Sequence, residues 1–136
     1  MVSKESNMES DLLVVDDSAA IRKILQRVLR QTGMLIGNIY EAGDGQEALT
    51  LLETKKVDLI LSDINMPRMD GLQLLASLKA SAEWRNIPVI MITTEGGATK
   101  VSEAGRLGAA GYVRKPFSAD QIKEKLSGIL EGAQPL

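Results

Sequence analysis

Residues 12–18 read Leu-Leu-Val-Val-Asp-Asp-Ser, an apolar run that ends in two acidic residues and a hydroxyl. Four consecutive apolar residues predict a strand that is buried on both faces, because a strand with one face in solvent would alternate apolar and polar residues. Ser18 predicts a helix start, since its hydroxyl can accept a hydrogen bond from a free amide of the first turn. Gly33 predicts the helix end, and the apolar residues between them recur at helical spacing: Ile21, Ile24, Leu25, Val28 and Leu29.

The same succession of an apolar run and a helical stripe recurs along the rest of the chain. Further strands are predicted at residues 38–41, 59–61, 89–92 and 111–114. Further helices are predicted around residues 48–52, after Asp70, over residues 99–107 and after Ser118. Strands that alternate with helices favour an α/β fold, with a mostly parallel sheet covered by helices on both faces.

The length of 136 residues corresponds to one domain. We expect a flexible tail at residues 1–10, the domain at residues 11–132 and a second tail at residues 133–136. No apolar run approaches the length of a membrane span, and the polar N-terminus does not resemble a signal peptide. The sequence therefore predicts a cytoplasmic protein without membrane insertion.

Charge and composition exclude several classes of function. Sixteen basic and eighteen acidic residues give a net charge of −2, so no basic excess favours binding to nucleic acid. The absence of cysteine excludes disulfides, thiol catalysis and cysteine-bound metals. Histidine is also absent, so a histidine that donates a phosphoryl group would belong to another molecule.

Polar side chains follow the predicted strands at the points where these strands end. Asp16 and Asp17 follow the first strand, Asp63 the third, Thr93 the fourth and Lys115 the fifth. Parallel strands end at the same edge of a sheet, where ligands of such folds bind. Each residue alone has an ordinary explanation as a helix cap, a turn residue, a strand residue or a surface lysine. Their coincidence at strand ends favours one shared pocket.

Three carboxylates in one pocket repel one another. Two like charges 4 Å apart cost about 4 kcal/mol at an effective dielectric constant of about 20. A site that has a few carboxylate oxygens and leaves other coordination positions open suits Mg²⁺, whose charge would offset this repulsion. Lys115 could bind an anion there, and Thr93 offers a hydroxyl. These groups together predict a phosphoryl-transfer site in which an aspartate acts as the nucleophile.

Four segments of the chain resemble the signature segments of the response-regulator receiver domains of two-component systems. They are residues 12–18, 61–71, 91–95 and 111–117. The resemblance covers about residues 12–130. Among receivers, the single-domain chemotaxis regulators are most similar, judged by Asn65, Glu95, Tyr112 and the lack of an output domain.

The resemblance implies a flavodoxin-like fold, doubly wound (βα)5, with a five-stranded parallel sheet in the order 2-1-3-4-5. It implies that Asp63 is the phosphoacceptor and that the Lys115 side chain contacts the phosphoryl group. It also implies that the peptide bond between Lys115 and Pro116 is cis. It further implies that Mg²⁺ is bound by Asp16, Asp17, Asp63 and the main-chain carbonyl of Asn65.

The resemblance also implies a switch. The Thr93 hydroxyl would move towards the phosphoryl oxygens, and Tyr112 would turn inward. The fourth helix, fifth strand and fifth helix would then bind a motility target or another protein. Asn65, Thr94 and Glu95 would modulate the kinetics. The other partners would be a sensor histidine kinase of the chemotaxis type and a phosphatase. The protein would be a monomer that catalyses only its own phosphorylation and dephosphorylation, and not an enzyme.

Three alternatives can be compared with this prediction, and the residues of the sequence argue against the last two. A single-domain relay or phosphate sink unrelated to motility would use the same residues. A magnesium-dependent phosphohydrolase of the haloacid dehalogenase type would need a second aspartate two residues after the nucleophile, whereas Asp16 and Asp17 are adjacent. A flavin protein would need a hydroxyl-rich phosphate loop and stacking aromatic residues, which make up only 3% of this chain.

Overall fold

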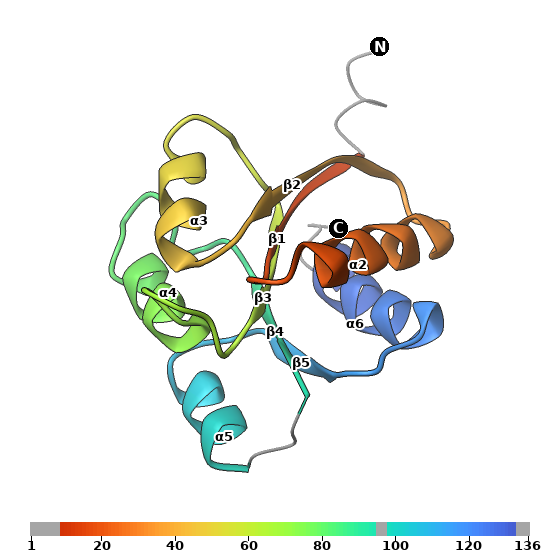
Figure 1. The fold of residues 1–136 in the computed structure, drawn as a ribbon. Helices are drawn as coiled ribbons and strands as arrows, with labels where there is room; N and C mark the ends of the chain where they lie inside the picture. Colours follow the sequence, from red (N-terminus) through yellow and green to blue (C-terminus); the bar gives the residue numbers. More distant parts are fainter. Residues whose placement is uncertain (1–8, 95–97, 133–136) are drawn as a thin grey trace.

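The computed structural model describes residues 9–94 and 98–132, which contain one five-stranded parallel sheet between two layers of helices (Figure 1). The strand order is β2-β1-β3-β4-β5, so the predicted order 2-1-3-4-5 is confirmed. The strands are β1 (Ser10–Val15), β2 (Ile36–Ala42), β3 (Leu59–Asp63), β4 (Val89–Thr93) and β5 (Gly111–Arg114).

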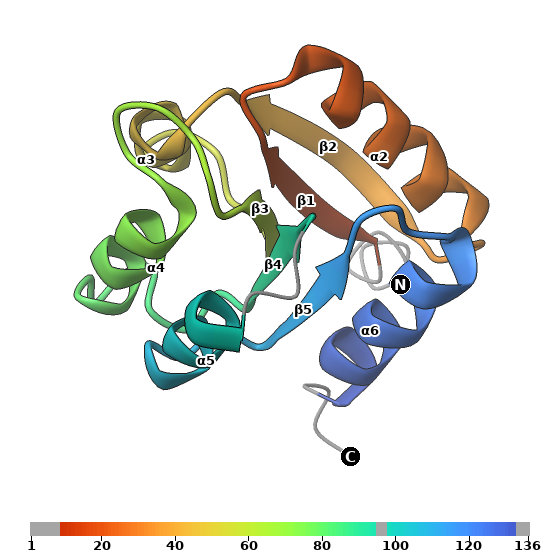
Figure 2. The ribbon, with the colours of Figure 1, turned by 60° about the horizontal axis from the view of Figure 1, so that its bottom comes forward.

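The helices of the described residues cover both faces of this sheet, as Figures 1 and 2 show. Helices α2 (Ala19–Gln31) and α6 (Ala119–Gly132) lie side by side on one face. Helices α3 (Gly45–Leu52), α4 (Gly71–Lys79) and α5 (Ala98–Arg106) cover the other. None of the helices in this part of the chain combines the length and apolar character needed to cross a membrane.

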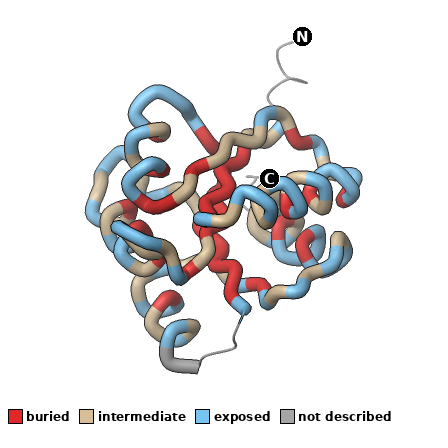
Figure 3. Tube along the Cα trace, viewed as in Figure 1, coloured by how far each residue is buried: buried red, intermediate tan, exposed pale blue. Residues whose placement is uncertain are grey.

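The central strands are buried along most of their length, as Figure 3 shows for the middle of the molecule. Alternate residues of β1, β3 and β4 enter two separate apolar clusters. Leu13 and Ile60 pack with α3, α4 and α5, whereas Leu12 and Leu61 pack with α2 and α6. The unbroken apolar runs therefore arise from burial on both sides, as predicted.

Three predicted helix starts are confirmed by their hydrogen bonds. The Ser18 hydroxyl accepts from the amide of Ile21 at 3.2 Å. Asp70 and Gln73 form a reciprocal capping box at the start of α4. The Ser118 hydroxyl likewise accepts a hydrogen bond from the amide of Gln121 at 3.2 Å. Each cap satisfies an amide that has no partner inside its helix.

Some boundaries and faces differ from the expectation. Ser10, which we expected in the N-terminal tail, opens β1 because its amide donates to the carbonyl of Leu35 at 3.0 Å. Ile24 is 44% exposed although it shares the apolar stripe of α2, since Leu25 and Leu29 already fill the side that faces the sheet. Residues 1–8 and 133–136 of the expected tails lie outside the described residues.

Candidate functional site

Three carboxylates meet at the carboxyl edge of the sheet. Asp16 and Asp17 directly follow β1, and Asp63 is the last residue of β3, the strand that pairs with β1. One carboxylate oxygen of each lies within 4.8 Å of the others. Asp16 is buried, Asp63 is partly buried and Asp17 is exposed. The pairing of the two strands thus builds an acidic pocket that is open to solvent on one side.

Lys115 brings an ammonium group into this pocket from the end of β5. Its Nζ lies 2.9 Å from Oδ2 of Asp16 and 3.8 Å from Oδ1 of Asp63. Its amide donates to the carbonyl of Thr93 at 2.7 Å, which fixes the chain after β5 against the end of β4. The peptide bond to Pro116 is cis, as the resemblance implies. The structure therefore brings Lys115 and the aspartates together.

The pocket has an excess of negative charge. Burial raises the pKa of the Asp63 carboxyl group, the positive charge of Lys115 opposes this rise, and the negative charge of Asp16 adds to it. The amide of Ile64 donates to Oδ1 of Asp63 at 2.8 Å and favours the ionised form. One ammonium faces three carboxylates here, so the site attracts a further cation.

The donor set of the pocket indicates which cation fits. Asp16, Asp17 and Asp63 offer oxygen atoms only, and the chain has no cysteine or histidine to add sulfur or imidazole ligands. Hard divalent ions prefer such oxygen ligands. The cluster therefore fits Mg²⁺ better than a transition metal that selects nitrogen or sulfur.

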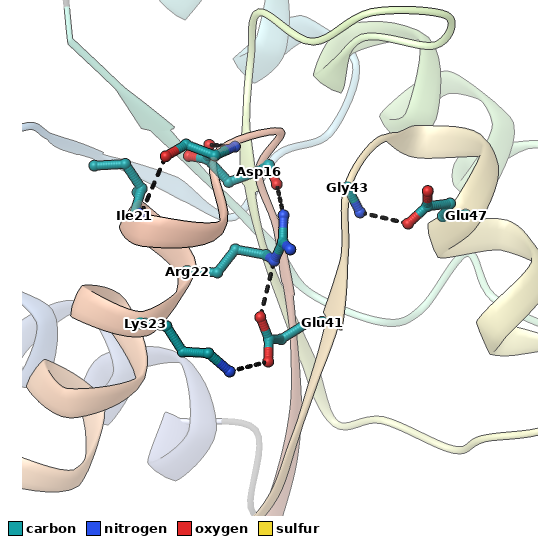
Figure 4. Close-up of polar contacts among 8 residues, drawn as sticks. Asp16, Ile21, Arg22, Lys23, Glu41, Gly43 and Glu47 are labelled. Carbon is teal, nitrogen blue, oxygen red and sulfur yellow. Dashed lines mark hydrogen bonds and ion pairs between the residues drawn. The ribbon is translucent and has the colours of Figure 1, made fainter.

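Helix α2 holds Asp16 in place through its first turns (Figure 4). The amide of Ser18 donates to Oδ1 of Asp16 at 2.9 Å, and Arg22 donates from Nη1 to the main-chain carbonyl of Asp16. The Nε atom of Arg22 and the ammonium of Lys23 each lie 2.9 Å from the carboxylate of Glu41 on β2. These two cations, Lys23 most strongly, lower the pKa of Glu41 to about 2.

A glycine is required where α4 begins behind Asp63. A Cβ atom on Gly71 would lie 2.2 Å from the carbonyl oxygen of Asp63 and 2.9 Å from Cα of Ile64. The amide of Gly71 also donates to the carbonyl of Ile64 at 2.8 Å. The close backbone approach places the N-terminus of α4 directly against the end of β3.

Three further predicted site residues lie in or directly after β4 and β5. Thr93 is buried at the end of β4, and Thr94 follows it as an exposed residue. Tyr112 on β5 is 44% exposed, and its ring centroid lies 5.8 Å from Nζ of Lys125. Glu95 lies outside the described residues.

Asn65 lies in the β3–α4 loop, two residues after Asp63, with an exposed side chain. Its Oδ1 accepts a hydrogen bond from Nζ of Lys100 on α5 at 2.7 Å. Sequence reasoning missed Lys100, because no local pattern in the chain marks a lysine that reaches another element.

A response regulator receiver domain model matches residues 12–127. The chemotaxis protein CheY-3 of Vibrio cholerae is 40% identical over 125 residues, which cover 92% of this chain and 95% of that protein. The chemotaxis protein CheY of Pseudomonas aeruginosa is 39% identical over 120 residues, which cover 88% and 95%.

Solved structures agree with these sequence matches. The chemotaxis response regulator CheY4 of Vibrio cholerae has a TM-score of 0.78 at 31% identity and covers 89% of this chain and 98% of its own. The receiver domain of a signal transduction histidine kinase from Syntrophus aciditrophicus has a TM-score of 0.82 at 30% identity, with coverages of 93% and 94%. This chain therefore belongs to the response regulator receiver domain family.

Proposed function

We propose that this chain is a phosphorylation-activated response regulator that accepts a phosphoryl group on Asp63 from a phosphohistidine of a sensor kinase. The observation that supports this function best is the cluster of Asp16, Asp17 and Asp63 beside the ammonium of Lys115. The absence of histidine from the chain agrees with a donor on another molecule.

The reaction is a transfer between two nucleophiles. A carboxylate oxygen of Asp63 attacks the phosphorus atom, and an oxygen–phosphorus bond forms. The phosphorus–nitrogen bond to the donor imidazole breaks, and its electron pair stays on the imidazole nitrogen. Lys115 lies 3.8 Å from Oδ1 of Asp63 and can bind oxygens of the transferred group. Its ion pair with Asp16 already holds it in place.

Mg²⁺ would be held by Asp16, Asp17, Asp63 and the main-chain carbonyl of Asn65. When bound, the ion supplies positive charge that offsets the charge of the carboxylates and the phosphoryl group. The oxygen-only donor set of the three aspartates supports this assignment. Asp16, buried and held by Ser18 and Arg22, would be the most rigid of the ligands.

Phosphorylation would act on the rest of the molecule through Thr93 and Tyr112. The Thr93 hydroxyl would bind a phosphoryl oxygen, and Tyr112 would turn inward from its exposed position. The surface of α5, β5 and α6 would then favour a protein target. The 44% exposure of Tyr112 supports this role, because an exposed side chain can become buried when it turns inward. Thr94 and Glu95 would modulate the kinetics together with Asn65.

The relatives support a place for this switch in chemotaxis, with a CheA-like kinase as donor and a motility protein as target. Two of them, from Vibrio cholerae and Pseudomonas aeruginosa, are chemotaxis proteins. Such a switch acts as a cytoplasmic monomer. The likeness to a receiver domain of a histidine kinase favours a phosphorelay intermediate as the second candidate function.

The phosphoacceptor is tested by incubation with acetyl phosphate and Mg²⁺, followed by intact-mass measurement. We expect one phosphate-sized gain in mass, which requires Mg²⁺ and is absent in Asp63→Asn. Asp120→Asn removes an exposed carboxylate from α6 and should take up phosphate as the wild type does. A gain that survives in Asp63→Asn would contradict the assignment.

The choice between motility and relay is tested by capture of partners with beryllofluoride-treated and untreated protein. A motility protein that binds only the treated form supports the chemotaxis function. Capture of a histidine phosphotransfer protein in place of a motility protein supports the relay.

A further inference from the structure

Lys100 places a positive charge beside the loop that follows Asp63. Its ammonium donates to Oδ1 of Asn65 at 2.7 Å. Within residues 9–94 and 98–132, no carboxylate forms an ion pair with Lys100. The cation is therefore held by the neutral amide oxygen of a residue that follows Asp63 by two positions in the sequence.

This contact fixes the orientation of the Asn65 amide. A lysine ammonium has only donors, so the atom of Asn65 that faces it is the oxygen. The NH2 group, which carries both donors, lies at the opposite corner of the amide. Without Lys100, the exposed Asn65 side chain can rotate, and its amide then has no fixed orientation.

We propose that Lys100 is a positioning residue for the reaction at Asp63, because it holds the Asn65 amide in one orientation and joins α5 to the β3–α4 loop. This inference rests on the phosphorylation of Asp63 proposed above. The β3–α4 loop directly follows Asp63, and a hydrogen-bond donor of this loop that is already oriented helps to position an attacking water or a phosphoryl oxygen, without loss of rotational freedom in the reaction.

The step that Lys100 promotes is the hydrolysis of the acyl phosphate. The oxygen of a water molecule attacks the phosphorus atom, and the phosphorus–oxygen bond to Asp63 breaks. The carboxylate leaves with the electron pair, and the proton lost by the water passes to solvent as inorganic phosphate forms. Loss of the oriented Asn65 donor slows this step, so Lys100, which acts through Asn65, shortens the lifetime of the phosphorylated form.

The experiment measures how long the phosphate survives after acetyl phosphate is removed. We expect Lys100→Met and Asn65→Ala each to lengthen the lifetime about threefold to tenfold, as for the loss of one hydrogen bond. The phosphorylated form of the double variant should have the same lifetime as that of Asn65→Ala alone, because Lys100 acts through Asn65. Lys100→Arg keeps both charge and donor and should restore a lifetime close to that of the wild type.

Arg106→Gln is the matched control, since it removes an exposed cation from the other end of α5. Its lifetime should equal that of the wild type. An unchanged or shorter lifetime in Lys100→Met overturns the proposal, as do additive effects in the double variant. An equal effect of Arg106→Gln also overturns it, because general charge would then explain the result.

A second measurement does not need phosphate. The NMR signals of the Asn65 side-chain NH2 group, assigned by their loss in Asn65→Ala, should shift in Lys100→Met but not in Arg106→Gln. Absence of this shift overturns the Lys100 contact even if Asp63 is phosphorylated. If the wild type gains no phosphate, the proposed function and the role of Lys100 in it both fail, whereas a shift with unchanged lifetimes overturns the role of Lys100 alone.

Discussion

The guanidinium group of Arg68 donates to the carboxylate of Asp44, which is only 1% exposed. Asp44 also caps α3, because its Oδ1 accepts from the amide of Glu47 at 2.9 Å. This amide, followed by Arg68, lowers the pKa of Asp44 against the opposing effect of burial. Arg68 has a φ of 62°, which is uncommon for a residue with a side chain. The contact thus joins the β3–α4 loop to the start of α3.

Replacement of Asp44 should destabilise the fold more than replacement of an exposed cap. We expect Asp44→Ala to lower the free energy of unfolding by about 2–3 kcal/mol, because it removes a helix cap and a partly buried charge-assisted hydrogen bond. Urea-induced unfolding measures this change. Asp70→Ala, which removes the less buried cap of α4, should cost only about 1 kcal/mol. Equal costs for the two variants would show that the contact with Arg68 adds no stability.

Two glycine replacements should change stability in opposite directions. Gly71→Ala would force a methyl group against the main chain of Asp63 and Ile64, so we expect a loss of about 3 kcal/mol or more. In α6, a Cβ atom on Gly128 would meet no atom within 4 Å beyond the nearby residues of its own helix, and Gly128→Ala should stabilise the helix by about 0.5–1 kcal/mol. Thermal unfolding of both variants tests this difference, and a tolerated Gly71→Ala would contradict the close approach.

The fold could be predicted from the sequence because its signals are local. Unbroken apolar runs marked the central strands, and Ser18, Asp70 and Ser118 marked helix starts that their hydrogen bonds confirm. The gathering of the aspartates also followed from topology, since parallel strands end at one edge. The order of the strands did not follow from these patterns and came from the family resemblance.

The contacts between side chains far apart in the sequence could not be predicted in the same way. Arg68 meets Asp44 across 24 positions of sequence, and Lys100 meets Asn65 across 35. The sequence around a lysine or an arginine does not indicate which distant residue its side chain contacts. For Asp44 a signal was present, because an aspartate followed three residues later by Glu47 is typical of a helix start. The structure is needed to show that this cap is buried and paired.

Glu41 should contribute to stability in a range of pH that its pKa defines. Lys23 and Arg22 lower the pKa of Glu41 to about 2, so the folded state favours the ionised carboxylate. This contribution is complete above the ordinary glutamate pKa of about 4.3 and is lost as the pH falls towards 2. We expect Glu41→Gln to lower the free energy of unfolding by about 1 kcal/mol at pH 7, since the ion pairs are partly exposed.

The difference between wild type and Glu41→Gln should shrink between pH 4.5 and 2, as measured by urea unfolding at several pH values. Glu53→Gln is a suitable control, because Glu53 is an exposed residue at the end of α3 and should leave the pH profile unchanged. A difference that stays constant down to pH 2 would show that the ion pairs of Glu41 do not stabilise the fold.

Removal of one charge from the acidic pocket should stabilise the protein in the absence of metal. Asp16, Asp17 and Asp63 place carboxylate oxygens within 4.8 Å of one another, and Lys115 offsets only part of their charge. In a buffer with a chelator at neutral pH, Asp63→Asn should therefore raise the free energy of unfolding by about 1 kcal/mol. Differential scanning calorimetry would record this as a higher melting temperature than that of the wild type.

Addition of Mg²⁺ should reverse this order if the pocket binds the ion. At ten times its dissociation constant, a ligand that binds only the folded state stabilises it by about 1.4 kcal/mol. The wild type should gain this amount, and Asp63→Asn should gain less, because it has lost one oxygen ligand of full charge. Asp120→Asn, outside the pocket, should respond as the wild type does. Equal responses of wild type and Asp63→Asn would place the ion away from Asp63, and the charge of the pocket would then have to be balanced in another way.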